Sequence, residues 1–142
     1  MKIKSTFYYL VPALILGSML TMSLTFNRTS DTGPWVAPKS ADTIVNRFGN
    51  ADALSEGKKL YGQLCSVCHG DKGKGDGIAA AGLTPKPADH TSEKIQAQSD
   101  GAIFWKLTTG RPPMAGYAAS LTAKQRWALV GYIRTLKKAA KK

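Results

Sequence analysis

The sequence predicts an all-α domain over residues 52–142 of the 142-residue chain. Three stretches carry helix signals: apolar residues at helical spacing after Asp52, a capping serine at Ser99, and a capping box that opens at Thr122. Long loops rich in glycine and proline separate these stretches. Three helices can bury only a small apolar core. We therefore expect a covalent cross-link or a cofactor to complete this core.

The first predicted helix begins after Asp52, a suitable N-cap residue, and runs towards the two cysteines. Its apolar residues recur at helical spacing as Leu54, Tyr61, Leu64 and Cys68. The next segment, GDKGKGDGIAAAG, contains five glycines and predicts a loop. Glycine has no Cβ atom, so the backbone of this loop can approach a neighbouring group closely.

Two further helices follow in the second half of the domain. One begins at Ser99, stops at Gly110, and carries the apolar residues Ile103, Phe104, Trp105 and Leu107. The stiff loop RPPMAGY comes next. The last helix opens with the capping box Thr122-x-x-Gln125 and presents an apolar face made of Leu129, Tyr132, Ile133 and Leu136.

The N-terminal segment predicts an extracytoplasmic location for this domain. Lys2 and Lys4 precede Phe7–Phe26, twenty residues without a charge. At about 1.5 Å per residue this stretch spans about 30 Å, the thickness of a bilayer core. The two lysines favour the cytoplasmic side, which places the rest of the chain on the periplasmic side of the inner membrane. Residues 1–26 are therefore predicted to be an uncleaved signal anchor, with a cleaved signal peptide as the alternative.

Residues 27–51 are predicted to be an extracytoplasmic tether. They contain glycine, proline and many small polar residues, and they show no helical period. The apolar residues of the tether are Trp35, Ile44, Val45 and Phe48. The sequence leaves open whether these side chains pack on the domain or lie near the membrane surface.

The charge of the chain favours acidic partners. It has 20 Lys and Arg against 9 Asp and Glu, a formal net charge of +11, and it ends in a lysine-rich tail. Acidic protein faces and anionic lipid fit this balance. Nucleic acid is not expected, because the sequence has no helix-turn-helix cue, zinc-finger spacing or aromatic RNA-binding motif.

The segment CSVCHG holds both cysteines of the chain, Cys65 and Cys68, followed directly by His69. A disulfide between these two thiols would close a very small loop and stabilise little. A redox-active dithiol usually accompanies a βαβ pattern, which the sequence lacks. Zinc would need four ligands, and His90 is the only other candidate besides this crowded trio.

The motif favours covalent attachment of a haem. Cys-x-x-Cys-His is the signature of c-type haem attachment, in which the two thiols bind the porphyrin. His69 would then lie under the iron as its axial ligand. The export segment and the absence of any other cysteine support this reading. We therefore expect one covalent haem c held by Cys65 and Cys68, and its large apolar ring would complete the core.

From Asp52 to Leu136 the sequence resembles the class I monohaem cytochromes c of small bacterial type. The resemblance rests on GKKLYGQLCSVCHG, GKGDG, the single methionine of the domain in GRPPMAGY, and VGYIRTL in the last helix. It implies a small helical domain wrapped around one haem. It also implies that Gly57, Tyr61 and Tyr132 lie where the first and last helices cross.

The resemblance implies His69 and Met114 as the two axial ligands of the iron. In similar cytochromes the distal methionine occupies the place that Met114 has here, in a loop before the last helix. His90 is an alternative ligand, or a residue near a haem propionate. The methionine fits the ligand role better, because the prolines of its loop hold it outside any helical period.

Other haem contacts are implied less directly. Arg111 is expected to bond a propionate, with a solvated loop cation as the alternative, and Trp105 to contact the haem by packing or by a polar bond. In related proteins a loop carbonyl accepts from the second ring nitrogen of the proximal histidine. The family's Gly-Asp-Gly-Pro reads Gly-Asp-Gly-Ile here, so that acceptor stays open between Ile78 and a residue near Pro85.

These features together imply a one-electron carrier of a bacterial respiratory chain rather than an enzyme. With both axial positions filled, the iron would have no site for a small-molecule substrate. The expected partners are redox proteins with acidic docking faces, together with the membrane through the N-terminal helix. The alternative is a haem enzyme or gas sensor whose distal ligand is labile.

Overall fold

The computed structural model describes residues 33–48 and 52–137. The predicted anchor at residues 1–26, the start of the tether and the last five residues of the basic tail lie outside these ranges. Within them the elements are η1 (Lys39–Thr43), α2 (Ala53–Leu64), α3 (Ser66–His69), η2 (Ala80–Gly82), α4 (Glu93–Gln96), α5 (Asp100–Thr109) and α6 (Ala123–Thr135). The described part of the chain has no β-strand, which confirms the all-α prediction. None of its helices is long and apolar enough to cross a membrane.

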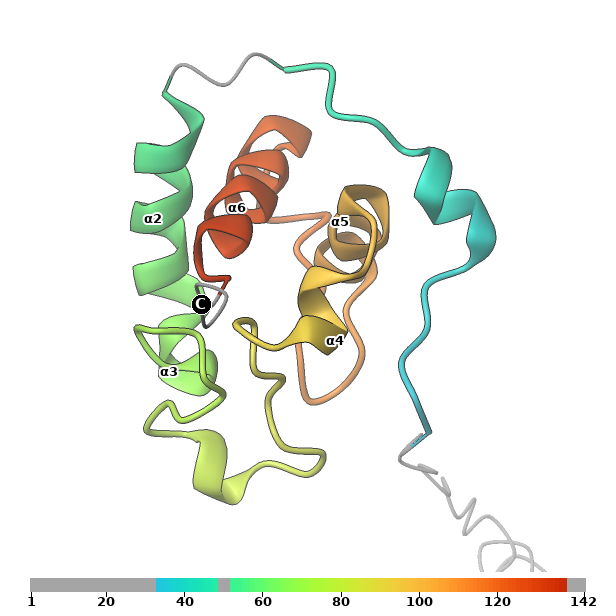
Figure 1. Ribbon diagram of the computed structural model, residues 1–142. Helices are drawn as coiled ribbons and strands as arrows, with labels where there is room; N and C mark the ends of the chain where they lie inside the picture. The colour runs from blue at the N-terminus through green and yellow to red at the C-terminus, as the bar shows by residue number, and fades with distance from the viewer. Residues whose placement is uncertain (1–32, 49–51, 138–142) are drawn as a thin grey trace, which may run out of the picture. The chain divides into compact units, whose positions relative to one another are not determined.

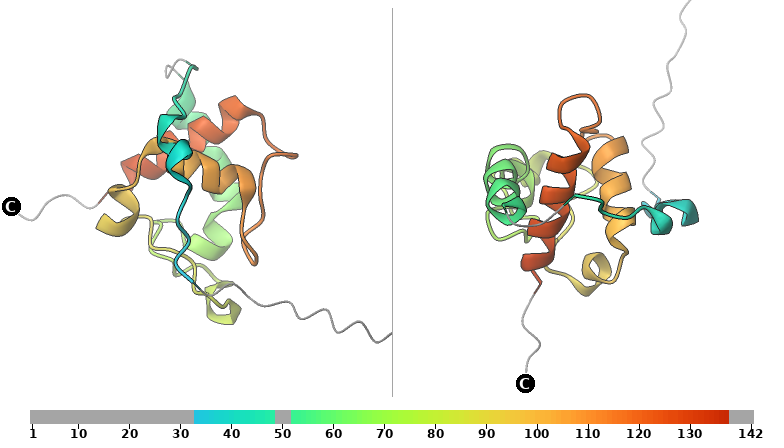
Figure 2. Two further views of the ribbon diagram at one scale, coloured as in Figure 1. Left: turned by 90° about the vertical axis from the view of Figure 1, so that its right-hand side faces the viewer. Right: turned by 90° about the horizontal axis from the view of Figure 1, so that it is seen from above.

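The first and last long helices, α2 and α6, lie side by side (Figures 1 and 2). Their contact depends on Gly57, because a Cβ atom there would lie 2.1 Å from the carbonyl oxygen of Ala128. The Tyr61 ring fills the crossing and lies 5.1 Å from the ring of Tyr132, centroid to centroid. Tyr61 is almost fully buried, whereas Leu54 of the same predicted pattern is 51% exposed.

The α5 helix supplies the other wall of the core. It buries Ile103, Phe104 and Leu107, and the Phe104 ring stacks on Trp127 of α6 with centroids 4.4 Å apart. As predicted, Ser99 caps this helix by accepting from the backbone N–H of Ala102. The predicted stop at Gly110 and the capping box at the start of α6 are confirmed too. The short helix α4 was not predicted from the sequence.

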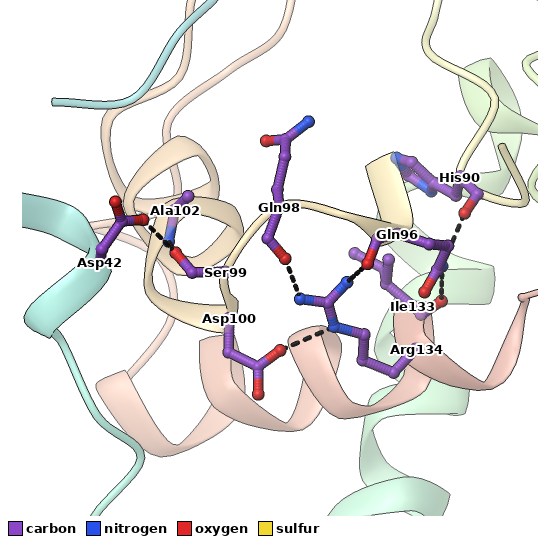
Figure 3. Close-up of polar contacts among 9 residues, drawn as sticks. All are labelled: Asp42, His90, Gln96, Gln98, Ser99, Asp100, Ala102, Ile133 and Arg134. Carbon is purple, nitrogen blue, oxygen red and sulfur yellow. Dashed lines mark hydrogen bonds and ion pairs between the residues drawn. The ribbon is translucent and has the colours of Figure 1, made fainter. Parts of the chain in front are cut away.

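The described part of the predicted tether packs on α5. Figure 2 shows η1 beside this helix, and Ala41 of η1 is 1% exposed. The close approach requires Gly101, since a Cβ atom there would lie 2.0 Å from the carbonyl oxygen of Ala41. The Ser99 hydroxyl donates to the carboxylate of Asp42 at the same junction (Figure 3). The sequence left open whether the apolar residues of the tether pack on the domain. Ile44 does so, because it packs against the core.

A polar cluster holds the segment between α4 and α5 against the end of α6 (Figure 3). The Arg134 guanidinium bonds the Asp100 carboxylate at 2.7 Å and donates to the carbonyl oxygens of Gln96 and Gln98. The Gln96 side-chain amide donates to the carbonyls of His90 and Ile133. These bonds tie the loop that carries His90 to the last helix.

Candidate haem site

The Cys-x-x-Cys-His motif lies at the junction of α2 and α3. Cys65 follows the last residue of α2, and the next four residues form the single turn of α3. The two cysteines form no disulfide; Cys65 is buried and Cys68 half-buried. Burial, together with the neighbouring Cys68, raises the pKa of the Cys65 thiol to about 12, so this thiol is neutral at physiological pH.

The imidazole of His69 is fixed by a backbone carbonyl. Its Nδ1 lies 2.9 Å from the carbonyl oxygen of Ala88. A carbonyl can only accept, so the proton is on Nδ1 and the Nε2 lone pair is left for a metal. Burial lowers the pKa of His69, although the bond to Ala88 opposes this effect. The acceptor that the sequence left open is thus Ala88, three residues beyond Pro85, while Ile78 is 92% exposed.

The glycine-rich loop positions that acceptor by folding back on the motif. The backbone N–H groups of Gly75 and Gly77 donate to the carbonyls of His69 and Cys68, at 2.8 and 3.1 Å. Gly75 has a φ of 76° and lies so close to the chain at Pro87 that a Cβ atom would be 2.5 Å from its carbonyl oxygen. Only glycine meets both conditions without strain, so this residue brings the segment with Ala88 onto the motif.

A cavity of about 890 Å³ opens in front of the motif. Cys65, Cys68, His69 and Met114 all line it. Its apolar wall consists of Leu64, Leu83, Ile95, Ile103, Leu107 and Ile133. Protein interiors hold few voids larger than a water molecule, so a cavity of this size is built for a ligand.

Met114 reaches the cavity from the loop between α5 and α6, drawn in orange in Figure 1. An isolated bridge shapes this loop: Arg111 and Met114 exchange backbone hydrogen bonds of 3.0 and 2.8 Å across the two prolines. The Met114 side chain packs against the core cluster. The predicted distal ligand and the motif histidine therefore face the same cavity.

His90 also lines the cavity, but it lies against His69. The two rings stack with centroids 4.0 Å apart and an angle of 19° between their planes. The Nδ1 of His90 lies 3.1 Å from the Tyr61 hydroxyl. Two imidazoles that bind one iron from opposite faces must each point a nitrogen at the metal. Rings stacked face to face, as His69 and His90 are, do not have this arrangement.

The rim of the cavity is positively charged. Of the described residues that line it, Lys86, Lys94, Lys106 and Arg111 are cationic, and Asp89 is the one carboxylate. Burial, followed by the charges of Arg111 and Lys94, lowers the pKa of Lys106. The sequence did not single out Lys106, because an isolated lysine gives no signal of its position in space.

The two predicted haem contacts differ in position. Arg111 lines the cavity, whereas Trp105 does not and instead packs against Trp35, with centroids 6.5 Å apart. Trp35 itself lines the cavity, together with Gly33 and Pro34. The sequence left open whether Trp35 packs on the domain, and it gave no sign that this residue would reach the haem cavity.

These residues fit the haem that the motif predicts. The thiols and the histidine stand at one wall, the methionine is available in the loop before α6, and the remaining wall is largely apolar. The cationic rim suits the two carboxylates that a haem carries at one edge. When bound, haem supplies one-electron chemistry, which protein side chains do not provide.

Known proteins share this chain's sequence pattern and fold. A family model for cytochrome c matches residues 54–137. Cytochrome c-554(547) of Halothiobacillus neapolitanus is 37% identical over 96 residues, which are 61% of this chain and the whole of that protein.

Two solved structures are also similar. A chain of the Kuenenia stuttgartiensis reducing HAO-like protein complex Kustc0457/Kustc0458 is 30% identical with a TM-score of 0.60. That alignment covers 68% of this chain and 49% of the other, so this chain spans about half of its length. The KustC0563 c-type cytochrome is 33% identical with a TM-score of 0.51, over 58% of this chain and 98% of the other.

The matched region runs from the second residue of α2 to beyond the end of α6, and therefore includes the whole motif and the methionine loop. It spans more than half of the chain, and a relative is similar over its full length. The chain therefore belongs to the cytochrome c family, whose members bind haem c covalently through a Cys-x-x-Cys-His motif, here Cys65, Cys68 and His69.

Proposed function

We propose that this protein is a one-electron carrier whose haem iron has His69 and Met114 as axial ligands. The observation that carries the proposal is that one cavity is lined by both cysteines, by a histidine with Nδ1 fixed on Ala88, and by Met114. A neutral imidazole and a thioether are the pair that raises the potential of a haem relative to two histidines. With both axial positions filled, electron exchange needs no substrate site at the iron.

Each residue has a separate task in this proposal. Cys65 and Cys68 hold the cofactor through thioether bonds, in which each thiol adds across a vinyl group. Ala88 fixes the orientation and protonation of His69 and makes it a stronger donor. The bridge between Arg111 and Met114 holds the sulfur-bearing loop in one conformation, so little rearrangement accompanies a change of charge at the iron.

The positive charge of the chain supports docking to acidic redox partners. The formal net charge is +11, and Lys72 and Lys74 lie exposed in the loop next to the motif. Such charges steer association with an acidic face, and the association rate falls as salt increases. We propose that the partners belong to a bacterial respiratory chain and that residues 1–26 anchor the protein in the inner membrane, with the haem on the periplasmic side.

A second candidate is a haem subunit that works inside a larger enzyme. It is favoured by the 30% identity to a chain of the reducing HAO-like protein complex. In that setting Met114 would be displaceable, and the iron would bind small molecules. The two candidates therefore differ in whether the distal position is closed.

The test uses the full chain, produced in cells with cytochrome c maturation. For the carrier, we expect low-spin bands after reduction and a weak far-red methionine–iron band in the oxidised protein. Met114→Ala should abolish the far-red band and permit binding of carbon monoxide, whereas His90→Gln should keep the band. A high-spin spectrum, or tight carbon monoxide binding to the wild type, would favour the second candidate. A low-spin wild type without the far-red band, whose low-spin state is lost in His90→Gln, would move the ligand role to His90.

A further inference from the structure

The segment before η1 forms part of the wall of the haem cavity. Gly33, Pro34 and Trp35 line the cavity, although they lie outside the region matched by the cytochrome c family model. The Trp35 ring is half-buried. This part of the cavity wall therefore does not belong to the region by which the family is recognised.

Two cationic side chains of the cavity rim hold Trp35 in place. The Lys106 Nζ lies 5.5 Å and the Arg111 Cζ 5.3 Å from the centroid of the indole ring, both within the range of cation–π attraction. Arg111 also donates from Nη1 to the carbonyl oxygen of Gly33 at 2.8 Å. The ring also packs against Trp105 in a tilted arrangement, with centroids 6.5 Å apart.

The segment is attached to the domain at a second point. Ala41 of η1 is buried against Gly101 of α5, and the Ser99 hydroxyl bonds Asp42. Ile44 packs against the core just beyond η1. The segment is therefore attached both before and after residues 36–40. This double attachment keeps Trp35 at the cavity, whereas a segment attached at one end could move away.

We propose that residues 33–44 form a strap across the haem cavity, with the Trp35 indole covering the edge of the haem that carries its two carboxylates. This inference rests on the proposed function, because it needs a haem in the cavity. The indole excludes water from the edge where Lys106 and Arg111 meet the haem carboxylates. It also occupies the faces of these cations, which keeps small anions away from the same edge.

The direct test is a nuclear Overhauser experiment on the reduced, diamagnetic full chain. We expect contacts between the Trp35 ring protons and haem substituents. The kinetic test measures reduction of the oxidised protein by ascorbate in wild type, Trp35→Ala, Trp35→Phe and Val36→Ala. Val36 is the matched control, since it is the next residue and is 75% exposed.

Trp35→Ala should be reduced several-fold faster than wild type, because water and the anionic reductant reach the uncovered edge. Trp35→Phe should restore most of the protection, and Val36→Ala should behave as wild type. Gly101→Ala, which displaces η1 from α5, should speed reduction although Gly101 is not among the residues that line the cavity.

The strap is overturned if Trp35 shows no contact with the haem, or if Trp35→Ala reacts like the wild type. Either result combined with a normal low-spin spectrum leaves the carrier function intact. A wild-type chain without a low-spin haem spectrum overturns the proposed function and the strap together.

Discussion

A Cβ atom added to Gly57 would lie 2.1 Å from the carbonyl oxygen of Ala128, so α2 and α6 cross with their backbones in contact. No side chain fits between these two positions. The crossing fixes the position of α2 against α6, and the motif cysteines follow directly from the end of α2. Close packing of the two helices therefore positions the haem attachment site as well as the core.

Gly57→Ala should destabilise the haem-loaded protein by about 1–3 kcal/mol, because the added methyl group forces two packed helices apart. Gly62→Ala is the matched control, since it lies in the same helix with no atom within 4 Å of the added Cβ. Alanine there should stabilise by about 0.4–1 kcal/mol, through its lower freedom in the unfolded chain. Denaturant unfolding of both variants checks the difference, and equal stabilities would contradict the crossing.

The features predicted correctly from the sequence are the local ones. The Ser99 cap and the capping box of Thr122 and Gln125 involve residues three positions apart, so their chemistry is readable in a short window. The motif is local in the same sense. Met114 stood out because it is the single methionine of the predicted domain and lies in a proline-rich loop.

The features that the sequence did not reveal depend on distant parts of the chain. Ala88 accepts from His69 because Gly75 folds the loop back, and nothing in an alanine indicates this role. Lys106 and Trp35 lie far apart in the sequence and meet only in the folded chain. The sequence left open where the apolar side chains of the predicted tether, residues 27–51, would lie. A single segment does not specify the surface that it covers.

Gly75→Ala should weaken the haem site through its effect on the backbone. A non-glycine residue at a φ of 76° is strained by about 1–2 kcal/mol, and the new Cβ atom would press on the carbonyl of Pro87. Movement of that segment displaces the carbonyl of Ala88 and alters the basicity of His69. We expect lower stability together with a shifted midpoint potential. Gly82→Ala, which meets nothing within 4 Å, should not lower the stability in denaturant unfolding and should leave the midpoint potential unchanged in redox titration.

Arg134→Met should destabilise the folded protein by about 1–3 kcal/mol, since it leaves the carbonyls of Gln96 and Gln98 without their donor. The ion pair itself contributes less, because the Asp100 side chain is 60% exposed and exposed pairs contribute at most about 1 kcal/mol. Asp100→Asn should therefore cost clearly less than Arg134→Met in thermal unfolding. Equal losses would mean that the ion pair, and not the backbone bonds, holds α4 to α6.

The stability of the protein should decrease as the pH is lowered, because His90 is buried in its neutral form. Burial, followed by the nearby His69, lowers the pKa of His90 to about 3, although Asp89 acts in the opposite direction. Its Nδ1 also lies in hydrogen-bond reach of the Tyr61 hydroxyl. Between about pH 3 and the ordinary pKa of about 6.5 the unfolded chain binds the extra proton, so the free energy of unfolding rises with pH in this window.

At pH 5 the proton taken up by unfolded His90 should cost about 2 kcal/mol of stability relative to pH 7.5. His90→Gln keeps an acceptor for the Tyr61 hydroxyl but removes the titrating ring, so this variant should lose that much less between the two pH values. Denaturant unfolding of both haem-loaded proteins at pH 5 and 7.5 measures the difference. If wild type and variant lose the same stability, His90 titrates near its ordinary pKa, and its ring is not held neutral between Tyr61 and His69.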